Sequence, residues 1–284
     1  MCEFYDKKNV ILNVLLYNFC VYKGTERRGR MSADQLVNVV GYAGKLLIES
    51  GAEIYRVEET MVRLSKSFQE VEDADSFVTL TGIMLSITVD HKTATKIIRV
   101  HSRGVDLHRI DRINHLSRSA SAHPLTLEQL EKELQDIDHD QPYSLLVTTI
   151  FSALTAFGFA FFFDGRVLEA LCSFIVGIFI KLITWLLERR EVNNFFINAI
   201  GGASAALITL FLHSQWPDSD VDIIIISSIM LLVPGLAITN AIRDTVAGDY
   251  LSGIARATEA ILVAVAIAVG IGFILSIFVM QGGA

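Results

Sequence analysis

The chain has 284 residues, 52% of them hydrophobic, and a formal net charge of −7 at pH 7. A negative chain without a basic stripe argues against nucleic acid as a partner. Charge is unevenly spread, because 18 of the 24 lysines and arginines precede residue 145. The composition therefore predicts a polar domain over 32–143 and an apolar, membrane-embedded domain over 144–284.

Residues 1–31 fit neither domain. The apolar stretch 9–22 is too short to span a membrane, and basic residues follow it, whereas in a signal peptide they precede the apolar run. Met31 stands directly before a well-formed helix start. We interpret 1–31 as an extension upstream of the native start, or as a peripheral segment.

Hydrophobic spacing in the polar domain predicts a small α+β fold. Two helices come first, three antiparallel strands rich in Val, Ile and Thr follow, and two helices close the domain. Gly51 marks the end of the first helix, and Thr126 caps the last. The expected elements are helices over 34–50 and 54–68, strands over 77–80, 83–89 and 95–101, and helices over 106–118 and 126–139.

Residues 51–63, with the sequence GAEIYRVEETMVR, place a polar face on the second helix. Glu53, Arg56, Thr60 and Arg63 share this face, opposite buried apolar positions. Such a face can hold a carboxylate, bind a partner or simply be solvated with pairing along the helix. The spacing alone leaves these alternatives open.

Five apolar stretches follow, each near the ~20 residues that a spanning helix needs. We expect five transmembrane helices at 145–163, 167–187, 195–213, 223–239 and 257–280. Arg189 and Arg190 place the second connection on the cytoplasmic side, and Arg243 and Arg256 place the fourth there. The polar domain is then cytoplasmic and the C-terminus lies outside.

The fourth stretch contains Pro234 and Gly235, which predict a break that frees polar backbone groups. Charged and polar residues follow directly: Asn240, Arg243, Asp244, Asp249, Ser252, Arg256 and Glu259. Discontinuous spans with polar linings are where transporters hold their substrates. The alternative is an ordinary cytoplasmic loop whose charges face water.

The last stretch carries small residues at every fourth position, namely Ala260, Ala264, Ala268 and Gly272. Small side chains let membrane helices approach closely. We therefore expect tight helix packing, within the chain or between chains.

Catalytic and metal-binding motifs are missing from the sequence. Cys2, Cys20 and Cys172 are scattered, and the histidines lack the spacing of a zinc site. The sequence also has no nucleophile elbow and no phosphate-binding loop. We therefore expect neither an enzyme nor a bound metal or cofactor.

Two segments together resemble the threonine/serine exporter family: GAEIYRVEET at 51–60, and PG at 234–235 followed by NAIRDTVAGDYLSGIARATEA at 240–260. The resemblance covers nearly all of 32–284. Full-length members of that family have a cytoplasmic domain and ten spans. With half of these spans, this chain resembles the split type, in which a second small protein of about five spans completes the transporter.

The resemblance implies roles for two sets of residues. The first would line or shape the substrate path: Pro234, Gly235, Asn240, Arg243, Asp244, Gly248, Asp249, Ser252, Gly253, Arg256 and Glu259. The second would couple the cytoplasmic domain to the membrane domain or gate it: Glu53, Arg56, Glu58, Thr60 and Arg63.

These observations lead to one hypothesis and one alternative. The hypothesis is secondary export of threonine, serine or a succinate-type dicarboxylate across the bacterial inner membrane by an oligomer with a second subunit. Either Arg243 or Arg256 would bind the carboxylate of the solute. One of the acids Asp244, Asp249 and Glu259 would carry a proton or provide the counter-charge. The alternative is a membrane-anchored sensor or scaffold without transport activity.

Overall fold

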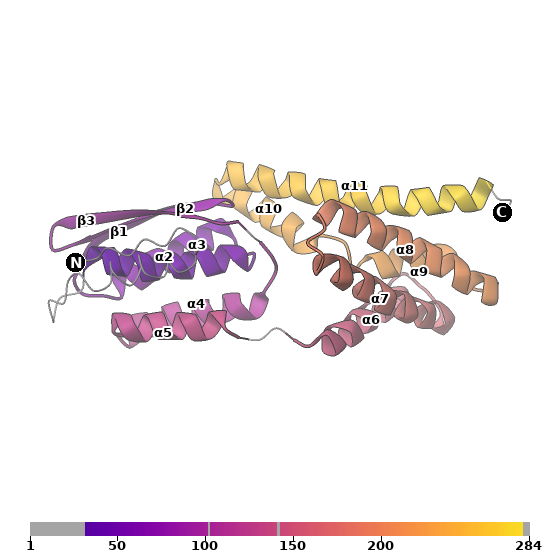
Figure 1. Ribbon diagram of the computed structural model, residues 1–284, viewed down its shortest axis with the longest axis horizontal. Coiled ribbons are helices and arrows are strands. Elements are labelled where there is room, and N and C mark those ends of the chain that lie inside the picture. Colours follow the sequence, from indigo (N-terminus) through magenta and orange to yellow (C-terminus); the bar gives the residue numbers. More distant parts are fainter. Residues whose placement is uncertain (1–31, 102, 141–142, 281–284) are drawn as a thin grey trace, which may run out of the picture.

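A computed structural model describes residues 32–101, 103–140 and 143–280, so the extension expected over 1–31 lies outside the described residues. The described chain is elongated, with an α+β domain at one end and a helical bundle at the other (Figure 1). The last helix of the α+β domain ends at Asp138, and the first helix of the bundle begins at Leu145.

The α+β domain has the expected order of elements. Ser32 and Thr126 form capping boxes at the starts of the first and last helices, as their side chains each accept a backbone N–H one turn later. The elements are α2 (Ala33–Glu49), α3 (Ile54–Lys66), β1 (Val71–Thr79), β2 (Gly82–Val89), β3 (Lys92–Arg99), α4 (Leu107–Ala122) and α5 (Leu127–Asp138).

The three strands form one antiparallel sheet in the order β1-β2-β3. Its inner face, including Ile83, Leu85 and Ile87, is buried in the core of the domain, and both α2 and α3 contact the sheet. β1 begins at Val71, earlier than the expected 77, because acidic side chains on its exposed positions hide the strand pattern in the sequence.

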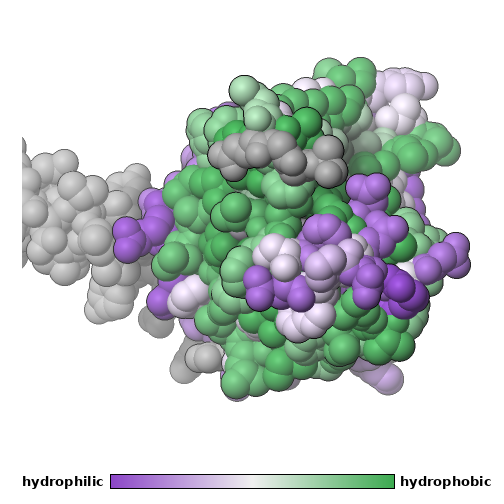
Figure 2. Space-filling model, turned by 90° about the vertical axis from the view of Figure 1, so that its right-hand side faces the viewer, coloured by the Kyte–Doolittle hydropathy of each residue, from purple (hydrophilic) through white to green (hydrophobic). Residues whose placement is uncertain are grey.

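Four helices in the described bundle are long and apolar enough to cross a membrane. They are α6 (Leu145–Phe162), α7 (Val167–Glu188), α8 (Asn194–Gln215) and α11 (Tyr250–Met280). Large apolar side chains such as Phe151 and Phe211, each 65% exposed, point outward. Figure 2, which looks at the bundle from its far end, shows a mostly hydrophobic surface with a hydrophilic cluster near its middle and further hydrophilic residues at the edges. This outer surface suits contact with lipid.

The expected spanning helix at 223–239 is corrected by the structure. This stretch is divided between two short helices, α9 (Val221–Ile229) and α10 (Gly235–Ala247), with turns between them. Pro234 precedes α10 and has no backbone N–H to continue a helix. Among the described residues there are therefore four long apolar helices and one broken segment, in place of five continuous helices.

The broken segment nevertheless connects the two ends of the bundle. At its start, the N–H of Asp220 donates to Glu169, next to the connection between α6 and α7. At its end, Asn240 of α10 donates to the backbone of Gly51 in the α+β domain. α11 then runs away from that domain, and its last turns lie at the opposite end of the described chain (Figure 1).

Candidate functional site

The loop between α2 and α3 turns three backbone groups toward the membrane half. Gly51 adopts φ +86, a left-handed conformation that suits glycine, and it ends α2 as the sequence predicts. The carbonyls of Gly51 and Ala52 and the N–H of Ile54 each bond to a side chain of α10 or α11. We call this contact region, formed by residues 51–54 with α10 and the first turns of α11, the interdomain joint.

α10 and α11 form a tight hairpin on the membrane side of the joint. Gly248 ends α10 with φ +101, again left-handed. Gly253 of α11 lies so close to α10 that an added Cβ would stand 2.1 Å from Thr245 Oγ1 and 3.0 Å from the Ala241 carbonyl oxygen. Both glycines are therefore required by the geometry of the hairpin. The hairpin in turn fixes the positions of Asp244 on α10 and Arg256 on α11.

Asp244 of α10 caps α3. Its Oδ1 accepts a hydrogen bond from the Ile54 N–H at 3.1 Å. Glu53, which precedes α3, makes no side-chain cap of its own. The first N–H groups of a helix lack partners within the helix and favour a negative charge. The membrane half thus supplies the cap that the α+β domain lacks.

Arg256 of α11 completes the centre of the joint. Its Nη2 donates to the Ala52 carbonyl at 2.6 Å. Its Nε lies 2.9 Å from Asp244 Oδ2, an ion pair by distance that lacks the alignment of a hydrogen bond. The two side chains are 9% and 0% exposed. Buried charges are tolerated when they are paired and bonded in this way.

Weaker polar contacts surround this buried pair. Arg243 bonds to Glu53, which also pairs with Arg56 at 3.2 Å. Burial alone would raise the pKa of Glu53, but the hydrogen bonds from its own backbone and from Arg243, with the charge of Arg56, hold that pKa below its ordinary value. Glu259 reaches Arg103 at 3.4 Å.

The remaining predicted coupling residues lie elsewhere on α3. Thr60 is buried and bonds to Asn114 of α4 within the α+β domain. Arg63 pairs with Glu59 along the helix surface. Glu58 accepts the N–H of Val78 in β1 at 2.9 Å, and burial together with the charges of Asp249 and Asp75 raises its pKa. Among the described residues of this set, Glu53 alone forms a side-chain hydrogen bond or ion pair with the membrane half, with Arg243 as its partner. The charge of Asp249 also acts on Glu58.

The predicted path residues divide in a similar way. Asn240, Arg243, Asp244 and Arg256 bond directly to the α+β domain, and Glu259 pairs with Arg103. The others shape the hairpin or the break: Gly248, Asp249, Ser252 and Gly253 lie at the hairpin, and Pro234 and Gly235 start α10. The structure thus brings Arg243, Asp244 and Arg256 together at the joint, whereas Asp249 lies at the hairpin.

Sequence reasoning missed the partners on the other side of the joint. Three of them are backbone groups of residues 51–54, which carry no side-chain signal. Arg103 also went unnoticed, because it lies in a connection without a motif. A second missed group is Glu169, fully buried at the far end of the bundle, where it binds Arg166 at 2.6 Å and the Asp220 N–H at 3.1 Å.

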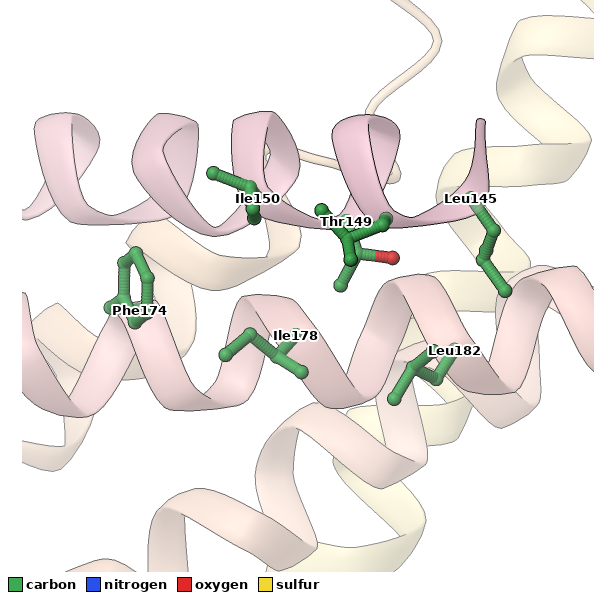
Figure 3. A pocket seen from close by; sticks show the side chains of 7 residues that line it. Leu145, Thr149, Ile150, Phe174, Ile178 and Leu182 are labelled. Carbon is green, nitrogen blue, oxygen red and sulfur yellow. The ribbon is translucent and has the colours of Figure 1, made fainter. Parts of the chain in front are cut away.

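An apolar hollow of about 290 Å³ opens between α6 and α7. In Figure 3, Leu145 and Ile150 of α6 face Phe174, Ile178 and Leu182 of α7, and Thr149 contributes a hydroxyl oxygen, drawn in red. None of the predicted path residues lines it. Its apolar walls suit a hydrocarbon group and offer no charge for a carboxylate.

The described residues contain no group of three or more His, Cys, Asp or Glu side chains that could hold a metal ion. Cys172 is buried and unpaired in α7, whereas Cys2 and Cys20 lie outside the described residues. The chemistry of the joint is therefore that of its two arginines, its carboxylates and its backbone groups.

Comparison with known proteins gives a family match over most of the chain. The family model described as "Putative threonine/serine exporter" matches residues 38–278. A protein of Escherichia coli K12 named "Probable succinate transporter subunit YjjP" is 27% identical over 246 residues, which are 84% of this chain and 93% of that protein. No solved structure matches.

Two further relatives are considerably longer than this chain. A "Threonine/serine exporter" of Corynebacterium glutamicum is 24% identical over 84% of this chain and 50% of its own length. A "Probable threonine/serine exporter" of Mycobacterium tuberculosis is 23% identical over 80% of this chain and 43% of its own length. The match therefore spans half or less of these two exporters.

Proposed function

Because this chain belongs to the threonine/serine exporter family, we propose that it is a subunit of a secondary transporter for small carboxylate-bearing solutes. The solutes are threonine and serine, or a dicarboxylate such as succinate, and they leave the cell across the bacterial inner membrane. A second small membrane subunit of the same family completes the assembly. The names of the relatives support both solute classes.

The orientation proposed for the chain follows from its basic residues. Arg189, Arg190, Arg243 and Arg256 favour the cytoplasmic side, and the last two lie in the interdomain joint. The α+β domain is then cytoplasmic and the C-terminus outside. The broken segment of α9 and α10 counts as a fifth passage, because it connects the two ends of the bundle.

The joint is the observation that carries the mechanism. Arg243 and Arg256 are suited to a carboxylate, since a guanidinium binds it with two parallel hydrogen bonds. Both are engaged by carboxylates of the protein itself, Glu53 and Asp244. We infer that the joint must loosen during transport, so that a solute carboxylate replaces these internal partners.

The length of α11 is consistent with a position of Arg256 outside the hydrocarbon core of the bilayer. Its 31 residues extend ~46 Å at 1.5 Å per residue, whereas the hydrocarbon core of a bilayer is ~30 Å thick. The first turns of α11, with Arg256, then extend beyond the hydrocarbon. Asp244, Asp249 and Glu259 would balance the charge of the bound solute or carry a proton.

Solute movement in liposomes tests this proposal. The chain is reconstituted with and without its second subunit, and counterflow of labelled succinate, serine and threonine is measured. We expect movement of at least one solute with both proteins, reduced at least tenfold in Arg256→Lys, because lysine cannot form the paired contacts of a guanidinium. Arg190→Lys, at an exposed position at the end of α7, is the matched control and should transport normally. Absence of movement for all three solutes with both proteins present contradicts the proposal and favours a sensor or scaffold.

A further inference from the structure

The outer face of the sheet carries a row of large apolar side chains. Phe77, Met84 and Ile97 lie directly opposite one another on the three strands and are 60%, 45% and 68% exposed. The next rows are polar, with hydroxyl pairs such as Ser86 with Thr95 at 3.0 Å. A contiguous exposed apolar row on a polar face is typical of an interaction surface.

A second uncovered surface lies on α11. One side of this helix packs on α8, where Gly270 lies so close to Ala199 that a Cβ would clash with its carbonyl. Elsewhere on the helix, the small residues Ala264, Ala268, Gly272 and Ser276 recur at every fourth position and are exposed. Gly272 has no atom within 4 Å of a Cβ position. Small side chains on membrane helices are enriched where another helix approaches.

These two surfaces lie on the same side of the molecule. In Figure 1 the sheet and α11 both run along the upper edge, with α2 and α3 below the sheet and α8 below α11. The strands and α11 are also roughly parallel to the long axis of the molecule. One partner that approaches from this side would therefore cover both surfaces at once.

We propose that this partner is a second copy of the chain, related by a two-fold axis along the long axis of the molecule. Two copies inserted in the same orientation can be related by a two-fold axis only if it is normal to the membrane. Such an axis parallel to the strands places each row of the sheet against the same row of the second copy. Met84 meets Met84, and Phe77 meets Ile97.

The same operation leaves no like charges opposed in the neighbouring row. There the outer face carries Asp75 on β1, Ser86 on β2 and Thr95 on β3, so each Asp75 faces a threonine of the other copy. The small stripe of α11 meets itself in parallel, which is the arrangement in which such stripes let two helices approach. The apolar row and the stripe are thus both self-complementary under one axis.

Cysteine cross-linking in membranes tests the interface. In a background with Cys2, Cys20 and Cys172 replaced, Met84→Cys and Ala268→Cys should each form a disulfide-linked dimer under mild oxidation, because residues near the axis meet their own copies. Gln135→Cys on α5 and Phe151→Cys on α6 are exposed controls away from the interface. We expect at least fivefold more dimer at the two test positions than at their controls. Cross-linking at either test position no greater than at its control overturns the proposal.

The mass of the particle gives a second readout that does not depend on new cysteines. The unmodified chain in lipid nanodiscs should contain two copies, whereas Met84→Asp combined with Ala268→Leu should contain one. Both side chains are exposed, so the melting temperature should stay within a few degrees, which separates lost association from misfolding. A single copy in the unmodified particle, or a stripe that cross-links only to another protein, contradicts the proposal. Neither readout measures transport, so failure here leaves the proposed function standing.

Discussion

Asp244 on α10 accepts a hydrogen bond at 3.1 Å from the backbone N–H of Ile54, the first residue of α3, although 190 positions separate them in the chain. A helix of the α+β domain is therefore capped by the membrane half. This relationship makes the order of α3 depend on the position of α10. A movement of α10 at the break before it would therefore disturb the cap of α3. This contact is a physical basis for coupling between the two halves.

The buried pair of Asp244 and Arg256 should dominate the stability of the joint. Asp244→Asn leaves an uncompensated charge on Arg256, and removal of one partner of a buried pair costs about 3–5 kcal/mol. We expect a clearly lower melting temperature in detergent, measured by intrinsic fluorescence. Asp222→Asn, at an exposed position in the first turn of α9, is the matched control and should change little. Asp244→Asn combined with Arg256→Met should recover part of the loss, whereas additive losses would show that the two side chains do not interact.

The outer pair of Arg243 and Glu53 should contribute much less. The Arg243 side chain is 53% exposed, and ion pairs open to solvent contribute about 0–1 kcal/mol. A double-mutant cycle with Arg243→Gln and Glu53→Gln, followed by thermal unfolding, measures this coupling. A coupling energy at 0.15 M salt that is as large as that of Asp244 with Arg256 would contradict the prediction.

The sequence predicts the elements of the α+β domain because their hydrophobic spacing, caps and turns are local. It also indicates that the charges after Pro234 need partners. A water-filled path and a protein surface can both provide such partners, and composition does not distinguish them. The contacts of Asp244 and Arg256 use backbone groups of residues 51–54, so their identity depends on how two distant segments are placed. The apolar row of Phe77, Met84 and Ile97 likewise appears only once the register of three strands is known.

Acid should weaken the joint through Glu53. Because the pKa of this carboxyl is held below its ordinary value, its contribution to stability is present above the pKa of the unfolded chain and is lost as pH falls through the folded value. We expect the melting temperature to fall as the pH is lowered from about 5. Glu53→Gln should lower it at neutral pH and flatten this part of the profile. If the melting temperature of Glu53→Gln fell with pH as steeply as that of the unmodified chain, other groups would be responsible for the acid sensitivity.

Glu58 should show the opposite sign. Its raised pKa, caused by burial and by the charges of Asp249 and Asp75, means that its contribution is present at low pH and is lost as pH rises through the folded value. Glu58→Gln keeps an oxygen for the Val78 N–H and removes the repulsion. We expect equal or greater stability at pH 7 in thermal unfolding, and a smaller gain as the pH is lowered. Reduced stability of Glu58→Gln at pH 7 would mean that the negative charge of Glu58 strengthens its hydrogen bond with the Val78 N–H of β1.

Packing between α10 and α11 should tolerate no side chain at Gly253. An added Cβ would meet Thr245 Oγ1 at 2.1 Å and the Ala241 carbonyl oxygen at 3.0 Å, so the helices must separate in Gly253→Ala. Overpacking of this kind costs about 1–3 kcal/mol. Gly235→Ala is the matched control, because nothing lies within 4 Å of its Cβ position, and alanine in a helix is favoured over glycine by about 0.5–1 kcal/mol. Urea unfolding should therefore move in opposite directions for the two variants. The hairpin positions Asp244 and Arg256, so Gly253→Ala should also increase hydrogen exchange at the Ile54 amide. Exchange protection equal to that of the unmodified chain would show that the packing of the hairpin does not affect the contacts of the joint.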